Sequence, residues 1–510
     1  MKRDTAVNYF TASLPAASFE TDRKQFLGSN EYGTWANPLS LQASELPGSE
    51  AQRGDNIAAL LVPLGTLQPG ESRQFVTQLG QEASLEAALP GIDKYNRLNK
   101  VEAALADLGR FWETYLEKQQ VETPDPALNS MLNIHNPRQC HTTLNWSRYL
   151  SLYQLGYGSR GIGFRDSSQD VMGALASAPE EANDLLRSLL SVQRPNGSAM
   201  HQFNPLSMIA EIGDSAESPD RPHYYSDDHL WAVQAVCAYL KETGDLDFLA
   251  EEVRYYTKNA RGEQEGKIES GSVFDHLCRA LAFTRSDVGA HGLPRLGYAD
   301  WNDTINLATG AESLLTACLY GKGLQEMIAL CAFLGNDAQA SIFTGWYGEI
   351  KATFNRVGWD GAWFASYFDA DGTPLGSHVN EAGQIYNYGQ SWPVISGLAD
   401  AEKGRQALEA VFERLNTRCG VKLSAPGFNG YDPAKGGITT YPPGAKENGG
   451  IFLHTNPWLV IAETLLGNGE RAYAYYAQIN PASKNNHNEE YECEPYVYAQ
   501  NILADEHPLF

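Results

Sequence analysis

The chain of 510 residues has a formal net charge of −24, with 43% apolar and 20% charged residues. This composition is typical of a folded globular protein with a large core and excludes collagen-like and disordered classes. The acidic balance disfavours nucleic acid as a partner, because phosphate backbones are bound by clustered Lys and Arg and no such cluster occurs. The length predicts one large domain with a smaller one attached.

No apolar run is long enough to span a membrane, and the N-terminus lacks the apolar centre of a signal peptide. We therefore expect a cytoplasmic protein with no membrane partner. The seven cysteines are scattered and show no C-x-x-C spacing, which indicates neither a disulfide framework nor a metal site. No cofactor is expected.

Residues 1–95 are predicted to form short strands and turns. The expected strands are Asn8–Ser13, Asn56–Leu64 and Ser72–Leu79. So few strands make a marginal sheet, and this region is interpreted as the remnant of a β domain.

Residues 96–122 are predicted to form a linking helix, because apolar residues recur at helical spacing from Val101 to Tyr115. Residues 123–510 are dominated by helical patterns, including a helix capped by Ser226 that stops before Gly244. The other expected helices are Asp275–Arg285, Glu312–Leu334, Ala338–Val357, Glu402–Thr417 and Phe452–Leu466. Paired helices over this length suit a toroid of about twelve helices.

Three loops concentrate glycine, carboxylates or histidine, and aromatic residues. They are Gly161–Asp170, Leu293–Asp303 and Tyr441–His454. Sugar sites use such mixtures, because sugar rings offer apolar faces and their hydroxyls need polar partners. Long functional loops inside a helical domain are also the usual place for a site.

Cleavage of a glycosidic bond needs an acid for the leaving oxygen and a nucleophile for the anomeric carbon. If the nucleophile is phosphate, the protein needs only cationic and backbone groups that hold the anion. Arg160, Arg165 and His454 are candidates for that task.

Four blocks in this order resemble the signature blocks of glycoside hydrolase family 94, the cellobiose and chitobiose phosphorylases. They are Phe164-Arg-Asp-Ser-Ser-Gln-Asp170, Ala299-Asp-Trp-Asn-Asp303, Lys446-Glu-Asn-Gly-Gly-Ile-Phe-Leu-His454 and Glu494-Pro-Tyr-Val-Tyr-Ala-Gln500. The resemblance implies a mainly α fold, in which an (α/α)6 barrel follows an N-terminal β-sandwich and a helical linker. It also implies a homodimer and inverting phosphorolysis of a β-linked disaccharide to a sugar 1-phosphate, with inorganic phosphate as co-substrate.

The resemblance makes Asp303 the general acid, and we expect burial beside Trp301 to raise its pKa. His454 would face phosphate, and Arg160 is added to the phosphate site for its charge and its nearness to the first block. The residues expected to bind substrate are Arg165, Asp166, Asp170, Trp301, Glu447 and Gln500.

The chain departs from the family pattern at both ends. Relatives carry most of the β-sandwich before the point where this chain begins, and a phosphate-gripping Thr-Gly loop beyond the fourth block. We therefore expect a chain truncated at both ends.

Two other functions stay open. One is an inverting β-glucosidase in which Glu447 activates water, and the other is a non-catalytic sugar-binding remnant. Each residue also has a structural interpretation: Asp300–Asp303 as a plain turn, Asp166 and Asp170 as the start of a helix, and His454 as a core histidine.

Overall fold

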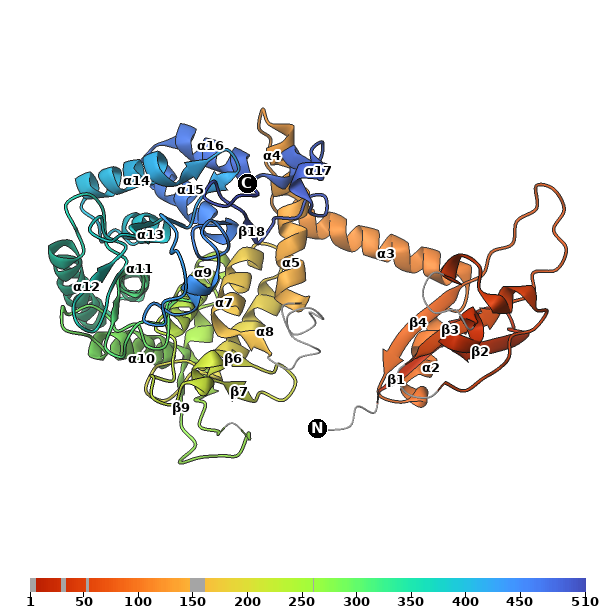
Figure 1. The fold of residues 1–510 in the computed structure, drawn as a ribbon. Coiled ribbons are helices and arrows are strands. Elements are labelled where there is room, and N and C mark those ends of the chain that lie inside the picture. Colours follow the sequence, from red (N-terminus) through yellow and green to blue (C-terminus); the bar gives the residue numbers. More distant parts are fainter. Residues whose placement is uncertain (1–5, 29–33, 52–54, 147–160, 260) are drawn as a thin grey trace. The chain divides into compact units, whose positions relative to one another are not determined.

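The computed structural model describes residues 6–28, 34–51, 55–146, 161–259 and 261–510. Contacts within the chain divide it into two units, Met1–Tyr115 and Leu116–Phe510. The division falls inside the long helix α3 (Leu98–Glu117) (Figure 1). The observed α3 matches the helix predicted from the apolar spacing between Val101 and Tyr115.

The N-terminal unit contains two antiparallel strand pairs. Strand β1 (Val7–Ala12) pairs with β4 (Thr77–Glu82), and β2 (Ser18–Asp22) pairs with β3 (Asn56–Leu61). Helices α1 (Arg23–Leu27) and α2 (Leu85–Lys94) complete this unit. The third strand was predicted too early, since β4 begins only at Thr77, and β2 was not predicted.

In the second unit, an inner set of helices alternates along the chain with an outer set, and the inner set contains the most deeply buried helices, α9 and α13. The inner helices are α7 (Phe164–Ala174), α9 (Asp228–Thr243), α11 (Leu314–Phe333), α13 (Tyr388–Ile395) and α15 (Asn456–Leu465). The outer helices are α8 (Pro179–Leu190), α10 (Val273–Ser286), α12 (Asp337–Val357), α14 (Ala401–Leu415) and α16 (Gly469–Ile479).

The burial of these helices shows the two layers. Twelve of the sixteen residues of α9 are buried, whereas only three of the twenty-one residues of α12 are. Each inner helix from α7 to α13 packs against the next one, and α5 (Asn136–Trp146) packs against α7. This is the arrangement of the predicted (α/α)6 barrel, and the mainly helical fold class is confirmed (Figure 1).

Short strands and turns connect the helices. The two three-stranded sheets are β5-β6-β7 (Ile162–Gly163, Gln202–Phe203, Ala210–Glu211) and β10-β11-β12 (Glu312–Ser313, Tyr367–Phe368, Pro374–Leu375). The pairs are β8 (Glu252–Arg254) with β9 (Ser270–Ser272), β13 (Ile385–Tyr386) with β16 (Ser424–Ala425), β14 (Asn416–Thr417) with β15 (Gly420–Val421), and β17 (Ile451–Phe452) with β18 (Asn501–Ile502). The short helix α4 (Pro126–Ser130) continues through the π-helical turn Met131–His135 into α5, and α17 (Asn488–Tyr491) is a short helix near the C-terminus.

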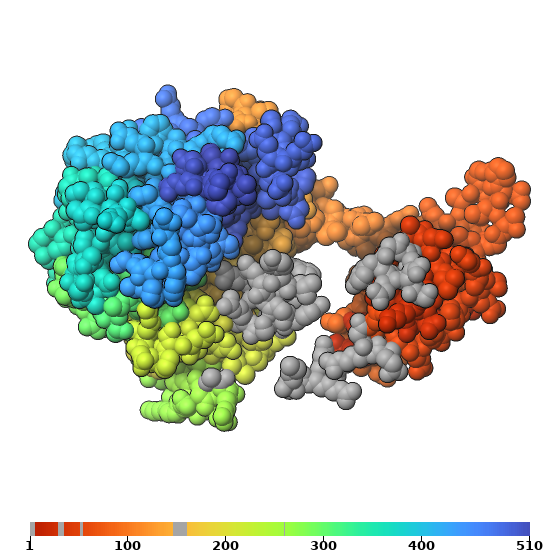
Figure 2. All heavy atoms as spheres, in the orientation of Figure 1, coloured from red at the N-terminus to blue at the C-terminus, as the bar shows by residue number. Residues whose placement is uncertain are grey.

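Short strands directly precede several inner helices. Strands β5, β10 and β13 lead into α7, α11 and α13, and β17 leads through a single turn into α15. The last residues of the chain pack on the segment before β17, where Ala504 donates its N–H to the carbonyl of Gly444. Figure 2 shows these final residues, in the darkest blue, beside that segment.

Two predicted helix starts were wrong. Asp227, not Ser226, occupies the N-cap of α9, because the Ser226 hydroxyl is bonded to Thr316 Oγ1 at 2.7 Å. The helix predicted from Phe452 begins at Asn456, since Leu453–Thr455 form a 3-10 turn. In the part of the chain that the structure describes, no helix has both the length and the apolar character needed to cross a bilayer.

Candidate functional site

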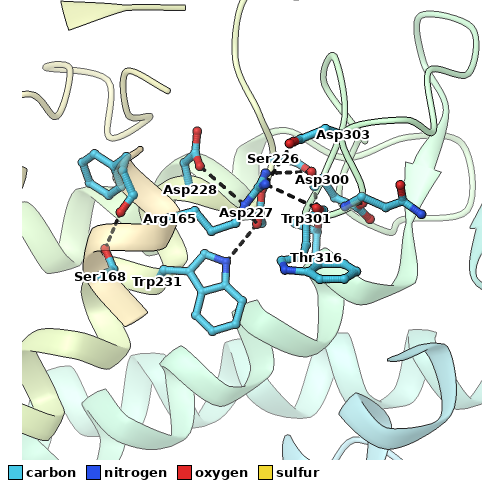
Figure 3. A network of polar contacts seen from close by, with 12 residues as sticks. Arg165, Ser168, Ser226, Asp227, Asp228, Trp231, Asp300, Trp301, Asp303 and Thr316 are labelled. Atoms are coloured by element: carbon cyan, nitrogen blue, oxygen red, sulfur yellow. Dashed lines mark hydrogen bonds and ion pairs between the residues drawn. The ribbon is translucent and has the colours of Figure 1, made fainter. Parts of the chain in front are cut away.

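Arg165 is the centre of a network of charges at the N-terminal ends of the inner helices. It is the second residue of α7 and is only 5% exposed. Its guanidinium forms a bidentate salt bridge with the carboxylate of Asp227, donating through Nε at 2.6 Å and through Nη2 at 2.9 Å. The same group binds Asp303 Oδ1 through Nη1 at 2.9 Å. Figure 3 shows Asp228 and Asp303 on opposite sides of this guanidinium.

The backbone of the Asp300–Asp303 loop also binds Arg165. Nη2 donates to the carbonyl of Asp300 at 2.7 Å, and Nη1 donates to that of Trp301 at 3.2 Å. Burial opposes the charge of Arg165, but the surrounding carboxylates raise its pKa well above the ordinary value. Arg165 therefore stays cationic and fixes the loop that carries the predicted acid.

The side chains of the Asp300–Asp303 loop differ in their surroundings. Asp300 is fully buried and accepts bonds from the Asn302 N–H at 2.9 Å and from Ser313 Oγ at 2.7 Å. Asn302 is buried in turn and accepts from Thr304 Oγ1 at 2.7 Å. The turn interpretation is therefore right for Asp300 and Asn302, whose side chains shape the loop.

Asp303 has the side chain that the loop presents outward. It is 46% exposed, so the predicted burial beside Trp301 was wrong. The physical reason is that Asp300, Trp301 and Asn302 are all buried and anchor the loop, and Asp303 is the first residue after them to reach the surface. The contact with Arg165 favours the ionised form of Asp303 in the unliganded chain.

Asp227 and Asp228 begin α9, where the positive end of the helix dipole favours carboxylates. Asp227 also accepts a bond from Trp231 Nε1 at 2.8 Å. Asp228 Oδ2 contacts His201 Nδ1 at 3.0 Å, and Asp228 Oδ1 lies 3.8 Å from Arg165 Nε. Burial raises the pKa of Asp228 to about 6, although His201 opposes this rise. Burial would lower the pKa of His201, but Asp228 overcomes that effect and raises it.

An aromatic cluster lies next to this network. The ring of Trp301 is 5.3 Å from that of His454 and 5.0 Å from that of Trp458. His454 is exposed, and its Nε2 contacts Gln169 Oε1 at 2.8 Å. The interpretation of His454 as a core histidine was therefore wrong, and the structure places this imidazole beside Trp301.

Glu447 also belongs to this site. The buried Asn448 holds its loop, donating through Nδ2 to the carbonyls of Phe428 at 2.9 Å and Tyr441 at 2.7 Å. Glu447 Oε2 is buried and has no hydrogen-bond partner among the described residues. Burial raises the pKa of Glu447, and the negative charge of Asp303 adds to that rise. The two carboxylates are therefore within electrostatic range of each other.

The remaining predicted residues are less central. Asp166 lies in the first turn of α7, over Gly163, where an added Cβ would meet its Oδ2 at 2.2 Å. Asp170 lies near Cys140 of α5. The pKa of the Cys140 thiol is raised mainly by its own burial, and the negative charge of Asp170 adds to that rise. The exposed Gln500 accepts the Leu453 N–H through its main-chain oxygen at 3.1 Å. Arg160 lies outside the described residues.

Three residues of the network were missed by the sequence analysis: Asp227, Asp228 and His201. The first two directly follow Ser226, the predicted cap of α9, and were not predicted to belong to a site. Two adjacent carboxylates at the start of a helix that is otherwise apolar were the available signal. Nothing in the sequence around His201 pointed to a site.

The comparison with protein families matches this architecture. Residues 111–510 match the family model described as the glycosyl hydrolase 94 superfamily, catalytic domain, and residues 1–98 match the glycosyl hydrolase 94 supersandwich domain. The chain belongs to glycosyl hydrolase family 94. The resemblance drawn from the four sequence blocks is thereby confirmed.

Several members of glycosyl hydrolase family 94 with assigned activities are similar along nearly the whole chain. An N,N'-diacetylchitobiose phosphorylase from Vibrio proteolyticus is 33% identical, over 98% of this chain and 62% of its own length. The enzyme of the same name from Vibrio furnissii is 32% identical with the same coverage. A solabiose phosphorylase from Paenibacillus borealis is 29% identical over 98% of this chain and 61% of its own length. The chain thus spans about three fifths of the length of these relatives.

Proposed function

We propose that the chain catalyses inverting phosphorolysis of a β-linked disaccharide, with Asp303 as general acid and inorganic phosphate as nucleophile. The observation that carries the proposal is the Arg165 network. It holds a half-exposed carboxylate at the ends of the inner helices, beside Trp301 and His454. The phosphorylase activities in the names of the relatives support the same reaction class.

In the proposed reaction, Asp303 gives its proton to the glycosidic oxygen while the bond from that oxygen to the anomeric carbon breaks. A phosphate oxygen forms the new bond on the opposite face of the sugar, which yields an inverted sugar 1-phosphate and a free sugar. Trp301 would offer an apolar face to the sugar that is cleaved off. Arg165, Asp166, Asp170, Glu447 and Gln500 remain the proposed partners of substrate hydroxyls.

The ion pair between Arg165 and Asp303 imposes a condition on this mechanism. It favours the carboxylate, whereas a general acid must hold a proton before the reaction. A phosphate anion bound near His454 would favour the protonated form of Asp303, because like charges disfavour ionisation. Phosphate would then act both as nucleophile and as the charge that prepares the acid.

The test is to incubate the chain with cellobiose or N,N'-diacetylchitobiose, with and without inorganic phosphate, and to identify the products. Sugar 1-phosphate formed only with phosphate, and lost in Asp303→Asn, is the expected result. Asp184→Asn is the matched control, because Asp184 lies on the outer helix α8 with a side chain that is 80% exposed. Calorimetric binding of the disaccharide without any turnover would instead identify a sugar-binding remnant.

The environment of Glu447 supports a second candidate, inverting hydrolysis with water as nucleophile. Its carboxylate is within electrostatic range of Asp303, and one of its oxygens lacks a hydrogen-bond partner among the described residues. Hydrolysis predicts equal turnover without phosphate and its loss in Glu447→Gln. Phosphate-dependent turnover that survives in Glu447→Gln would exclude it.

A further inference from the structure

A cavity lies outside the Arg165 network. It has a volume of about 750 Å³, and we call it the Arg194 pocket. Three segments enclose it: residues 194–200, residues 210–216 around the end of β7, and residues 256–259 with Glu265 after β8. Asp303, Trp301 and the other proposed substrate-binding residues do not line it. The pocket is therefore distinct from the site proposed for catalysis.

Arg194 lines this pocket and differs from the other partly buried arginines nearby. Arg187 and Arg279 each bind carboxylates, whereas no carboxylate of the described residues lies within 4.0 Å of the Arg194 guanidinium. Its contacts are Met200 Sδ at 3.1 Å and the carbonyl of His223 at 3.2 Å. Burial lowers the pKa of Arg194. A guanidinium has five N–H donors. These two contacts use two of them, so the others can donate to a bound anion.

The rest of the lining suits a sugar with an acidic group. Met200, Ile212 and Tyr256 supply apolar surface, and Glu211 and Glu265 supply carboxylates able to accept hydrogen bonds from sugar hydroxyls. Lys258 adds a second cation that forms no ion pair within the described part of the chain. An anion between Arg194 and Lys258 would gain charge-assisted hydrogen bonds, while the sugar ring covers the apolar wall.

The pocket shares its wall with the catalytic network. Met200 precedes His201, whose ring contacts Asp228. Gly213 also lines the pocket, and an added Cβ there would lie 2.5 Å from His201 Cδ2. The Arg194 pocket and the contact between His201 and Asp228 therefore lie on two sides of the same segment, residues 200–201.

We propose that the Arg194 pocket binds a small anionic sugar, a single hexose unit that carries a carboxylate or a phosphate. Its anionic group would contact Arg194 and Lys258, and its ring would lie against Tyr256. This proposal concerns a second binding site and does not depend on the reaction proposed for Asp303.

Isothermal titration calorimetry tests the proposal with glucuronate, glucose 6-phosphate and neutral glucose as probes. We expect at least one anionic sugar to bind about tenfold more tightly than glucose. Arg194→Gln and Lys258→Gln should each remove that difference. Arg254→Gln is the control, because Arg254 is an exposed residue of β8 outside the pocket lining. The two anionic probes distinguish a carboxylate site from a phosphate site.

Three results would overturn the proposal. The first is equal binding of glucose and both anionic sugars. The second is tighter anion binding that both pocket variants retain. The third is anion binding that survives in those variants but disappears in Arg165→Lys, because the anion would then occupy the catalytic network. Two independent pocket variants keep the test valid if one of them fails to fold.

Discussion

Asp300 provides a quantitative test of how the fold supports the candidate acid. Its carboxyl is fully buried, and burial raises its pKa from 3.8 to about 7. The native chain therefore keeps this proton at pH values where the unfolded chain has lost it. The free energy of unfolding must then decrease as the pH rises from about 4 to about 7.

The magnitude follows from the pKa. One pKa unit corresponds to about 1.4 kcal/mol, so burial of Asp300 costs about 4 kcal/mol above neutral pH. About 3 kcal/mol of this cost develops between about pH 4 and pH 7. Asp300→Asn keeps the shape of the side chain and removes the ionisation. As the pH rises over this range, the free energy of unfolding should therefore decrease by about 3 kcal/mol less in the variant than in the wild type.

Urea unfolding at a series of pH values, followed by tryptophan fluorescence, measures this difference. Trp301 and Trp231 lie in the same region and report its loss directly. Parallel pH dependences of the wild type and Asp300→Asn would refute the reasoning, since Asp300 would then ionise in the native chain as it does in water.

Two further predictions concern the supports of the network. Trp231→Phe removes the indole donor that contacts Asp227 Oδ2 at 2.8 Å, so we expect unfolding in urea to require about 1 to 3 kcal/mol less free energy; an unchanged midpoint would show that this bond contributes nothing. Gly213 has φ +63, and an added Cβ would lie 2.5 Å from His201 Cδ2, whereas Gly244 has φ +70 with no atom within 4 Å. Gly244→Ala should therefore cost about 1 kcal/mol, and Gly213→Ala should cost at least about 2 kcal/mol because it adds a steric clash; equal thermal shifts would contradict the close contact with His201.

The sequence predicted the helices well where a strong apolar period coincided with a terminating glycine. The C-terminal end of α9 at Gly244 is an example, and the predicted Ala338–Val357 differs from α12 by one residue. The starts were less accurate, because tertiary bonds decide them. Ser226 has the character of a cap, yet its hydroxyl is bonded to Thr316 on another helix.

The site was predictable only in part. The family blocks brought Arg165, Trp301, Asp303 and His454 to attention, and the structure places these residues in one region. The sequence could not show that Asp303 is half exposed and paired with Arg165, because that pairing joins residues 138 positions apart.

The contacts of Arg165 tie the start of α7 to the start of α9 and to the loop that precedes α11. Its partners lie 62 and 138 positions further along the chain, so no fragment that ends before Asp303 could assemble the network. A folding intermediate with only the first helices in place would carry Arg165 as a buried cation without its carboxylates, which is costly. That cost works against a chain in which α7 is packed without the segments that carry Asp227 and Asp303, so the same residue that holds the candidate acid also couples the folding of these segments.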